Sequence, residues 1–323
     1  MNKLLKVLAA SALVATVLVG CGKKGETGGD ATTAAKYAKA GLGVVSSYSE
    51  DGQVNTTMAA VGLDADGKVQ YIDIDVAQST PGGGDKEKTQ TKKELKEKYG
   101  MKSVSASMGV IKDGGEWYEQ AEYLENYCKG KTAEEIANIE TEKRDEEHTS
   151  VPKSGSDLTA GCTMDIGTFK EAIAKAIANA QDANAEKIGI GEVMSNGDAQ
   201  LDTTIALVAT DADGKVVYSK IDVAQINKDV TATKSERKDD YGMKSVSASM
   251  GAIEGGAEWY QQAEAFEKYC KGKTADEIAK TATEKRDEEH TSVPKSGSDL
   301  AAGCTMDIGA FLEAMSEAFS SAK

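Results

Sequence analysis

Two threonines in nearly identical surroundings are the residues best suited to carry chemistry. Thr163 ends the stretch DLTAGCT (157–163), and Thr305 ends its copy DLAAGCT (299–305). Each stretch precedes a segment with the apolar spacing of an amphipathic helix. The hydroxyl of such a threonine either caps the helix that follows or is the attachment point that the resemblance described below implies. A phosphoester at that point needs an exposed hydroxyl and small neighbours, and the free N–H groups and dipole of a helix N-terminus favour its negative charge.

The chain contains one unit twice. KYGMKSVSASMG (98–109) recurs as DYGMKSVSASMG (240–251), and TEKRDEEHTSVPKSGSDL (141–158) recurs unchanged from residue 283. Copies of about 140 residues are the size of domains rather than of solenoid repeats. We therefore assign residues 37–180 to a first repeat and residues 181–323 to a second.

Each repeat combines strand patterns with helix patterns. In the first repeat, 54–63 and 68–76 are strand-like and are joined by the turn DADG, with a weaker strand at 43–48 before them. The second repeat shows the same pair at 201–210 and 215–223. Helical spacing follows in 117–128, 132–139 and 166–180. The patterns predict an α+β fold of two tandem homologous domains, each a small antiparallel sheet packed with helices.

The first residues have the pattern of an export signal. Lys3 and Lys6 precede an apolar run that is too short for a comfortable membrane span. The run ends in LVGC, which looks like a lipobox, so we expect cleavage after residue 20 and a diacylglycerol on Cys21. Residues 21–36 have the composition of a flexible tether. The sequence predicts a lipoprotein anchored to the extracellular face of the cell membrane, and the alternative is an ordinary secretory signal.

Composition and missing motifs exclude several functions. A formal charge of −15 opposes binding to nucleic acid through a basic surface. The only histidines, His148 and His290, occupy equivalent positions, so neither repeat can build a multi-histidine metal site. P-loop, EF-hand and G-x-S-x-G patterns are missing as well. We therefore predict no metal site and no catalytic site, and a hydrolase is disfavoured.

The two threonine stretches resemble the flavinylation motif of FMN-binding-domain proteins, D-x-x-[ST]-G-A-T followed by a helix. In that family a flavin transferase joins FMN through its phosphate to the last threonine. The resemblance implies covalent FMN on Thr163 and on Thr305, two per chain. It also implies that the transferase recognises the acidic residue and the glycine of each stretch, which are Asp157, Gly161, Asp299 and Gly303.

The likeness extends beyond the motif. TKKELKEKYGMK and GGEWYEQAEYLENYCKGKTAEEI resemble the two-domain flavin lipoproteins of Gram-positive extracellular electron transfer, and the resemblance covers most of both repeats. It implies an electron carrier, not an enzyme, that passes electrons from a membrane quinol-linked donor to ferric iron or free flavin. The chain departs from the general motif at Ala160 with Cys162 and at Ala302 with Cys304. The alternative is a solute-binding or surface-interaction lipoprotein without a cofactor.

Four cysteines remain besides Cys21. Cys128 and Cys162 lie in the first repeat, and Cys270 and Cys304 lie in the second. An even set outside the cytosol suggests one disulfide per repeat, and free thiols are the alternative. The tryptophans at 117 and 259 are expected in the core rather than over a flavin ring, and the histidines are expected in solvated loops.

Overall fold

The computed structural model describes residues 35–82 and 90–323. The predicted signal peptide, the lipidation site Cys21 and nearly all of the tether lie outside these residues. No helix within the described residues is long and apolar enough to cross a bilayer. By their contacts, all of the described residues belong to one compact unit.

The first repeat contributes three long strands, a short hairpin and several helices. Its strands are β1 (Tyr37–Tyr48), β2 (Val54–Leu63), β3 (Val69–Ser79), β4 (Thr141–Glu142) and β5 (Val151–Pro152). Its α-helices are α1 (Lys92–Leu95), α2 (Lys102–Ser107), α3 (Trp117–Cys128), α4 (Ala133–Ala137) and α5 (Gly167–Ala178). Two 3-10 helices accompany them, η1 (Lys96–Tyr99) and η2 (Asp157–Ala160).

The second repeat follows the same order with one added strand. Its strands are β6 (Gln181–Ala185), β7 (Lys187–Asn196), β8 (Leu201–Thr210), β9 (Val216–Ile226), β10 (Thr283–Glu284) and β11 (Val293–Pro294). Its helices are α6 (Lys234–Arg237), η3 (Lys238–Tyr241), α7 (Lys244–Ser249), α8 (Trp259–Cys270), α9 (Ala275–Ala279) and α10 (Gly309–Ser321). Small antiparallel sheets with helices confirm the predicted α+β class.

The two sheets have the strand orders β3-β2-β1-β6 and β7-β8-β9. Strand β6 belongs to the second repeat in sequence, yet it pairs with β1, with Gln181 opposite Ala40. The boundary between the repeats at residue 181 is therefore crossed by hydrogen bonds. Strand β1 is also longer than the predicted strand at 43–48 and begins at Tyr37.

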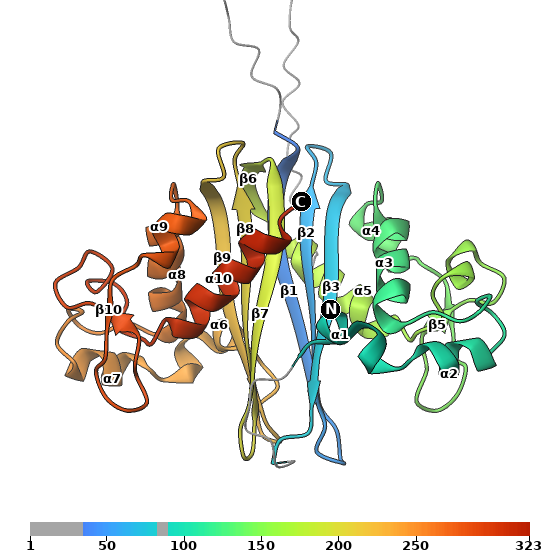
Figure 1. The fold of residues 1–323 in the computed structure, drawn as a ribbon, viewed down its shortest axis with the longest axis horizontal. Helices are drawn as coiled ribbons and strands as arrows, with labels where there is room; N and C mark the ends of the chain where they lie inside the picture. The colour runs from blue at the N-terminus through green and yellow to red at the C-terminus, as the bar shows by residue number, and fades with distance from the viewer. Residues whose placement is uncertain (1–34, 83–89) are drawn as a thin grey trace, which may run out of the picture. The chain divides into compact units, whose positions relative to one another are not determined.

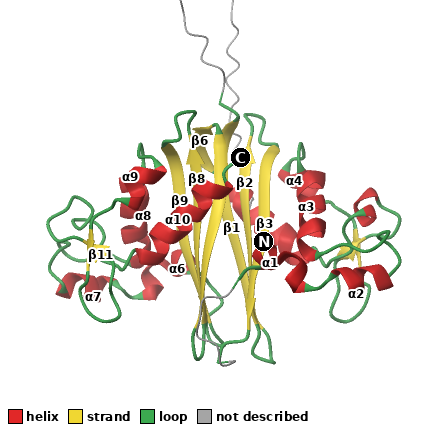
Figure 2. Cartoon of the chain, in the orientation of Figure 1, coloured by secondary structure: helices red, strands yellow, loops and turns green. Residues whose placement is uncertain are grey.

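The sheets pack face to face, and helices cover their outer faces. Along β2, Met58 and Ala60 face the second sheet, whereas Ala59 and Val61 face α3 and α5. The second repeat repeats this alternation, and α8 and α10 cover its sheet. Figures 1 and 2 show the strands in the middle and the helices on both sides. The order of layers is helix, sheet, sheet, helix.

Glycines on β1 let α5 lie directly on the sheet. A Cβ on Gly41 would lie 2.1 Å from the carbonyl oxygen of Ala176, and a Cβ on Gly43 would lie 2.1 Å from that of Ala172. Gly189 and Gly191 have the same relation to α10 in the second repeat. These glycines also weaken the strand pattern in the sequence, which is why the start of β1 was not predicted.

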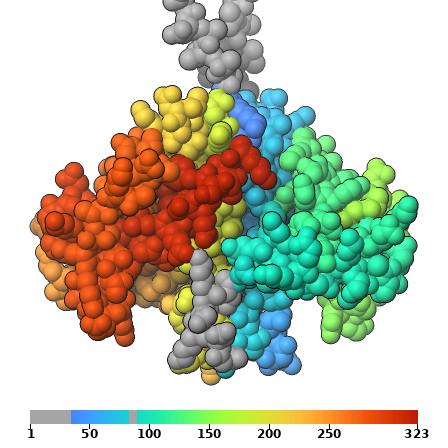
Figure 3. Space-filling view, in the orientation of Figure 1, coloured from blue at the N-terminus to red at the C-terminus, as the bar shows by residue number. Residues whose placement is uncertain are grey.

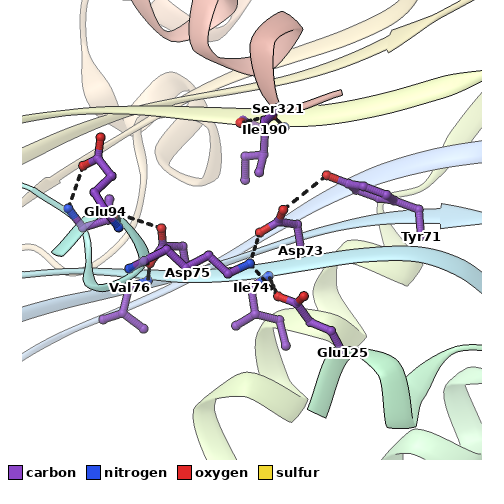
Figure 4. A network of polar contacts seen from close by, with 11 residues as sticks. Tyr71, Asp73, Ile74, Asp75, Val76, Glu94, Glu125, Ile190 and Ser321 are labelled. Atoms are coloured by element: carbon purple, nitrogen blue, oxygen red, sulfur yellow. Dashed lines mark hydrogen bonds and ion pairs between the residues drawn. The ribbon is translucent and has the colours of Figure 1, made fainter. Parts of the chain in front are cut away.

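A half-buried lysine ties α1 to the sheet in the first repeat. The Lys93 amine contacts the carboxylates of Asp73 and of Glu125, at 2.6 Å from the latter. Glu125 also accepts a hydrogen bond of 2.8 Å from the backbone N–H of Ile74 on the edge strand β3. Asp75 accepts from the Thr91 hydroxyl at the start of α1. Figure 4 shows Asp73, Asp75 and Glu125 as neighbours in this network.

The second repeat supplies its lysine from another element. Lys220 of β9 replaces Asp73 in the aligned sequences, and Ser235 of α6 replaces Lys93. The Lys220 amine lies 3.1 Å from Glu267, the counterpart of Glu125. Each of these two glutamates thus keeps one lysine partner, although the lysine comes from a helix in one repeat and from a strand in the other.

A further carboxylate lies in the groove between the repeats. GIGEV (189–193) aligns with GLGVV (41–45), so Glu192 occupies the position of Val44. The groove is lined by Asp75, Glu192 and residues of α10, and Figure 3 shows the surface of α10 (red) beside that of the α1 segment (teal). The Oε1 atom of Glu192 is buried and has no hydrogen-bond partner among the described residues. Burial, with the negative charges of Asp75 and Asp73, raises the pKa of Glu192 well above its usual range.

Replacement of Gly43 by alanine should destabilise the protein. The new methyl group would overlap the Ala172 carbonyl, so helix and strand must separate, at a cost of about 1–3 kcal/mol or more. Urea unfolding measures the loss, and Gly191→Ala repeats the test in the second repeat. Ser47→Ala, an exposed position on the same strand, is the control. An unchanged unfolding free energy for Gly43→Ala would contradict the close packing.

Glu192→Val should stabilise the protein, and increasingly so as the pH rises. A folded-state pKa above the unfolded value means that ionisation costs the wild type stability as the pH rises from about 4.5 toward the raised pKa. Valine removes this cost, which is about 1–3 kcal/mol for one unsatisfied buried group. The difference in unfolding free energy between variant and wild type should grow from pH 5 to pH 8. Glu171→Gln removes an exposed charge and should give a flat difference.

Candidate functional site

Each repeat has a pocket against its motif threonine. The first has a volume of about 490 Å³, within the usual range for small-molecule sites of roughly 300–1,000 Å³. The β4–β5 hairpin, the end of α2 and the loop around η2 form its walls. Its lining residues are Met108, Val110, Glu142, Arg144, Val151, Pro152, Ser154, Gly155, Thr159 and Thr163. The pocket therefore has mixed apolar and polar walls, with one cation, Arg144, and one anion, Glu142.

Thr163 is held by one side-chain oxygen from α3. Oε1 of Gln120 accepts hydrogen bonds from the Thr163 backbone N–H at 2.9 Å and from its hydroxyl at 3.2 Å. Gln120 is fully buried, and its Nε2 donates to the carbonyl of Gly115 at 2.9 Å. The amide of Gln120 is thus fixed at both ends. Only one of its two bonds to Thr163 depends on the hydroxyl. Thr163 is 7% exposed and Thr305 is half-buried, so the exposed hydroxyl expected for a phosphoester is not found at Thr163.

Thr163 does not cap the following helix, which corrects one of the two expectations for this residue. Helix α5 begins at Gly167, four residues later, with Ile166 at the N-cap position. The Asp165 carboxylate accepts from the N–H of Gly167 at 2.9 Å and from that of Ser150 at 2.8 Å. Because this carboxylate already occupies the helix N-terminus, the helix dipole is not the feature that would stabilise an anion on Thr163.

The positive charge at the site comes from Arg144. Its Nη1 donates to the Thr163 carbonyl at 3.0 Å and lies 3.5 Å from the sulfur of Met108. The hairpin turn holds this arginine, since the Arg144 N–H donates to the His148 carbonyl at 2.9 Å. Asp145 closes the turn by accepting from the imidazole of His148, and this bond lowers the pKa of Asp145 to about 2. His148 itself does not line the pocket.

The second repeat builds the same site with small changes. Gln262 accepts from the Thr305 N–H at 2.8 Å and from its hydroxyl at 3.1 Å, and Arg286 donates to the Thr305 carbonyl at 2.9 Å. The pocket is somewhat larger, about 560 Å³. Ala252 and Ala301 line it where the first pocket has Val110 and Thr159. The polar contacts are thus kept while the walls vary.

The remaining motif residues differ in their surroundings. Gly161 packs under Tyr123, whose ring would lie 2.2 Å from a Cβ at this position, so close packing alone requires a glycine there. In the second repeat Ala265 replaces the tyrosine, and a Cβ on Gly303 would lie 2.9 Å from it. The side chains of Asp157 and Asp299 are exposed, as recognition by another protein would need.

The cysteines and tryptophans lie in the cores. The structure has Cys128, Cys162, Cys270 and Cys304 as buried free thiols, with each repeat's pair in one apolar cluster. Burial raises the pKa of Cys128 and of Cys162 to about 12. The disulfides remain a prediction. Trp117 and Trp259 are buried in the cores, as expected, and do not line the pockets.

Sequence reasoning missed two residues of each site. Gln120 carried a usable signal, because it is a polar residue on the apolar stripe of α3, between Trp117 and Leu124. Such a residue must find a partner inside the protein. Arg144 carried none, since it lies in a charged run, KRDEEH, that is typical of a solvated loop.

A larger cavity of about 610 Å³ lies in the second groove between the repeats. Its walls include Leu42 and Lys175 from the first repeat, and Lys220 and Asp222 from the second. We prefer the smaller pockets as candidate sites because they occur in both repeats with the same polar residues. The described residues hold no group of three or more His, Cys, Asp or Glu side chains that could bind a metal.

Comparison with known proteins gives a partial match. Chlorophenol reductase of Desulfitobacterium hafniense is 30% identical over 129 residues. The match covers 32% of this chain and 38% of the reductase, so the chain spans well under half of that relative's length. No family model and no solved structure matches the chain. A likeness of this extent assigns no family.

Gln120→Leu should destabilise the first repeat by about 1–3 kcal/mol, because it leaves the buried N–H of Thr163 without an acceptor. Thr163→Val removes only the hydroxyl bond and should cost less. Urea unfolding of both variants and of the double variant gives the coupling between the two positions. Equal losses in the two single variants would show that the backbone bond contributes nothing.

Proposed function

We propose that the protein is an electron carrier outside the cell, with one FMN bound covalently to Thr163 and one to Thr305. A lipid on Cys21 would anchor it to the outer face of the cell membrane. A membrane quinol-linked donor would supply the electrons, and ferric iron or free flavin would accept them. In this proposal a flavin transferase attaches both groups, and the protein itself is not an enzyme.

The observation that carries the proposal is that each motif threonine lies in the wall of its own pocket. The motif alone is short, and a plain loop could carry it. If the motif were only a structural loop, there would be no reason for a pocket of ligand size beside the same threonine in both repeats. The partial likeness to a protein named as a reductase agrees with a redox role.

The residues of the pocket fit an FMN group. Met108, Val151 and Pro152 offer apolar walls for a flat ring, and the guanidinium of Arg144 suits the negative charge of a phosphodiester. FMN, when bound, accepts two electrons and releases them singly. Esterification takes the hydroxyl proton of Thr163, but Gln120 still accepts from its N–H. The protein therefore fixes the backbone of the attachment point whether or not the group is bound.

The main rival is a solute-binding lipoprotein that uses the same pockets reversibly and carries no covalent group. Both functions need apolar walls and a cation. The two functions differ in their need for the threonine. Covalent attachment requires a threonine hydroxyl at this position, whereas reversible binding does not. The mass of the mature protein therefore separates the two functions.

Co-expression with a flavin transferase should add two FMN groups to the mature chain, each with loss of one water. Thr163→Val and Thr305→Val should each lose one addition, because each removes one attachment oxygen. Intact-protein mass spectrometry measures this directly. Thr159→Val, which changes a threonine in the same pocket four residues away, should keep both additions. If the chain stays unmodified while a control substrate of the same transferase is modified, the result would contradict covalent attachment and favour the solute-binding function.

A further inference from the structure

We infer that the two sites of one chain do not exchange electrons with each other. Each works as a separate carrier, and electrons pass between them only through a second copy of the chain or a soluble acceptor. This inference rests on the proposed function, and its grounds are the layer order of the fold and the place of each pocket within it.

The two threonines lie in opposite outer layers. Thr163 is bonded to Gln120 of α3, which packs on the outer face of the first sheet. Thr305 is bonded to Gln262 of α8, which packs on the outer face of the second sheet. The core shared by the sheets lies between these layers. Figure 1 shows α2 and β5 at one end of the view and α7 and β10 at the other.

Layer spacings give the separation of the sites. Sheets packed face to face lie about 10 Å apart, and each helix layer adds about 10 Å. The two threonines are thus on the order of 30 Å apart. Electron tunnelling through protein falls exponentially with distance, so direct transfer between groups at the two sites is slow.

The core between the sheets offers no relay. It is built mainly from aliphatic side chains, with Tyr37 and Tyr71 at 6.1 Å between ring centroids and with Tyr48 and Tyr218 packed against it. Phenols lose electrons only at potentials far above those at which flavins work. Burial and the nearby Asp73 charge raise the pKa of Tyr71, so the phenol stays protonated. The described residues also hold no metal-binding cluster that could relay electrons in place of the tyrosines.

Each pocket instead opens to the outside. Val110 lines the first pocket and is 54% exposed, and Met250 lines the second and is 39% exposed. Val104 and Val246, on α2 and α7, are exposed nearby. An apolar rim of this kind suits transient contact with another molecule at each end. In such a contact the donor site loses one electron, the acceptor gains one, and protons exchange with water.

The test follows electron redistribution at several protein concentrations. The doubly flavinylated chain is compared with Thr163→Val and Thr305→Val, which carry one flavin each. An anaerobic light pulse with a photoreductant deposits single electrons, with some chains receiving two. Decay of the one-electron-reduced flavin absorbance is then recorded. We expect halving the concentration to double the half-life of this decay in all three proteins, as a second-order reaction requires.

A decay phase independent of concentration, present in the doubly flavinylated chain and missing from both single-site variants, would overturn the inference. That result would leave the proposed function standing, because it needs flavin at both sites. An unmodified mass of the mature chain overturns the proposed function instead, and this inference with it. The two failures are therefore read from different measurements.

Discussion

The apolar face shared by the two sheets is the contact on which the other features depend. A sheet with one face against another sheet has only its opposite face left for helices, so α3 and α5 must lie outside on one side and α8 and α10 on the other. Strand β6 crosses from one repeat to the other and covers part of the β1 edge. The repeats are thus parts of one folding unit, although each keeps its own helix core and its own pocket.

Local signals predicted much of the fold. Strand β2 and helix α3 have the predicted bounds because an alternating pattern and a helical stripe each report the burial of their own side chains. The sequence could not reveal which sheet faces which, since Met58 and Ala59 are both apolar and only their partners differ. In the site, the threonines were found through their motif. Gln120 was missed although its place on the apolar stripe of α3 is a signal, because its partner Thr163 lies 43 residues away. Arg144 was missed because its charged run is typical of a solvated loop.

The comparison of the two sites separates what is constant from what varies. The glutamine, arginine and threonine contacts are the same in both repeats to within about 0.1 Å. The walls are not, since Val110 and Thr159 become Ala252 and Ala301. The contacts that fix the backbone of the motif threonine thus keep their geometry, whereas the wall residues change the space available in the pocket. Any difference in ligand binding between the two sites should therefore come from the residues of the pocket walls.

The lysine that changes element between the repeats limits how their pieces can be recombined. A hybrid domain with β3 and α6 would have Asp73 and Ser235 at these two positions and therefore no lysine at either of them for its glutamate. The opposite hybrid, with β9 and α1, would place Lys220 and Lys93 at the same carboxylate. Strand and helix must therefore be inherited together, even though neither hybrid would look unusual in an alignment. Gene conversion between the two halves would be tolerated only in segments that span both elements.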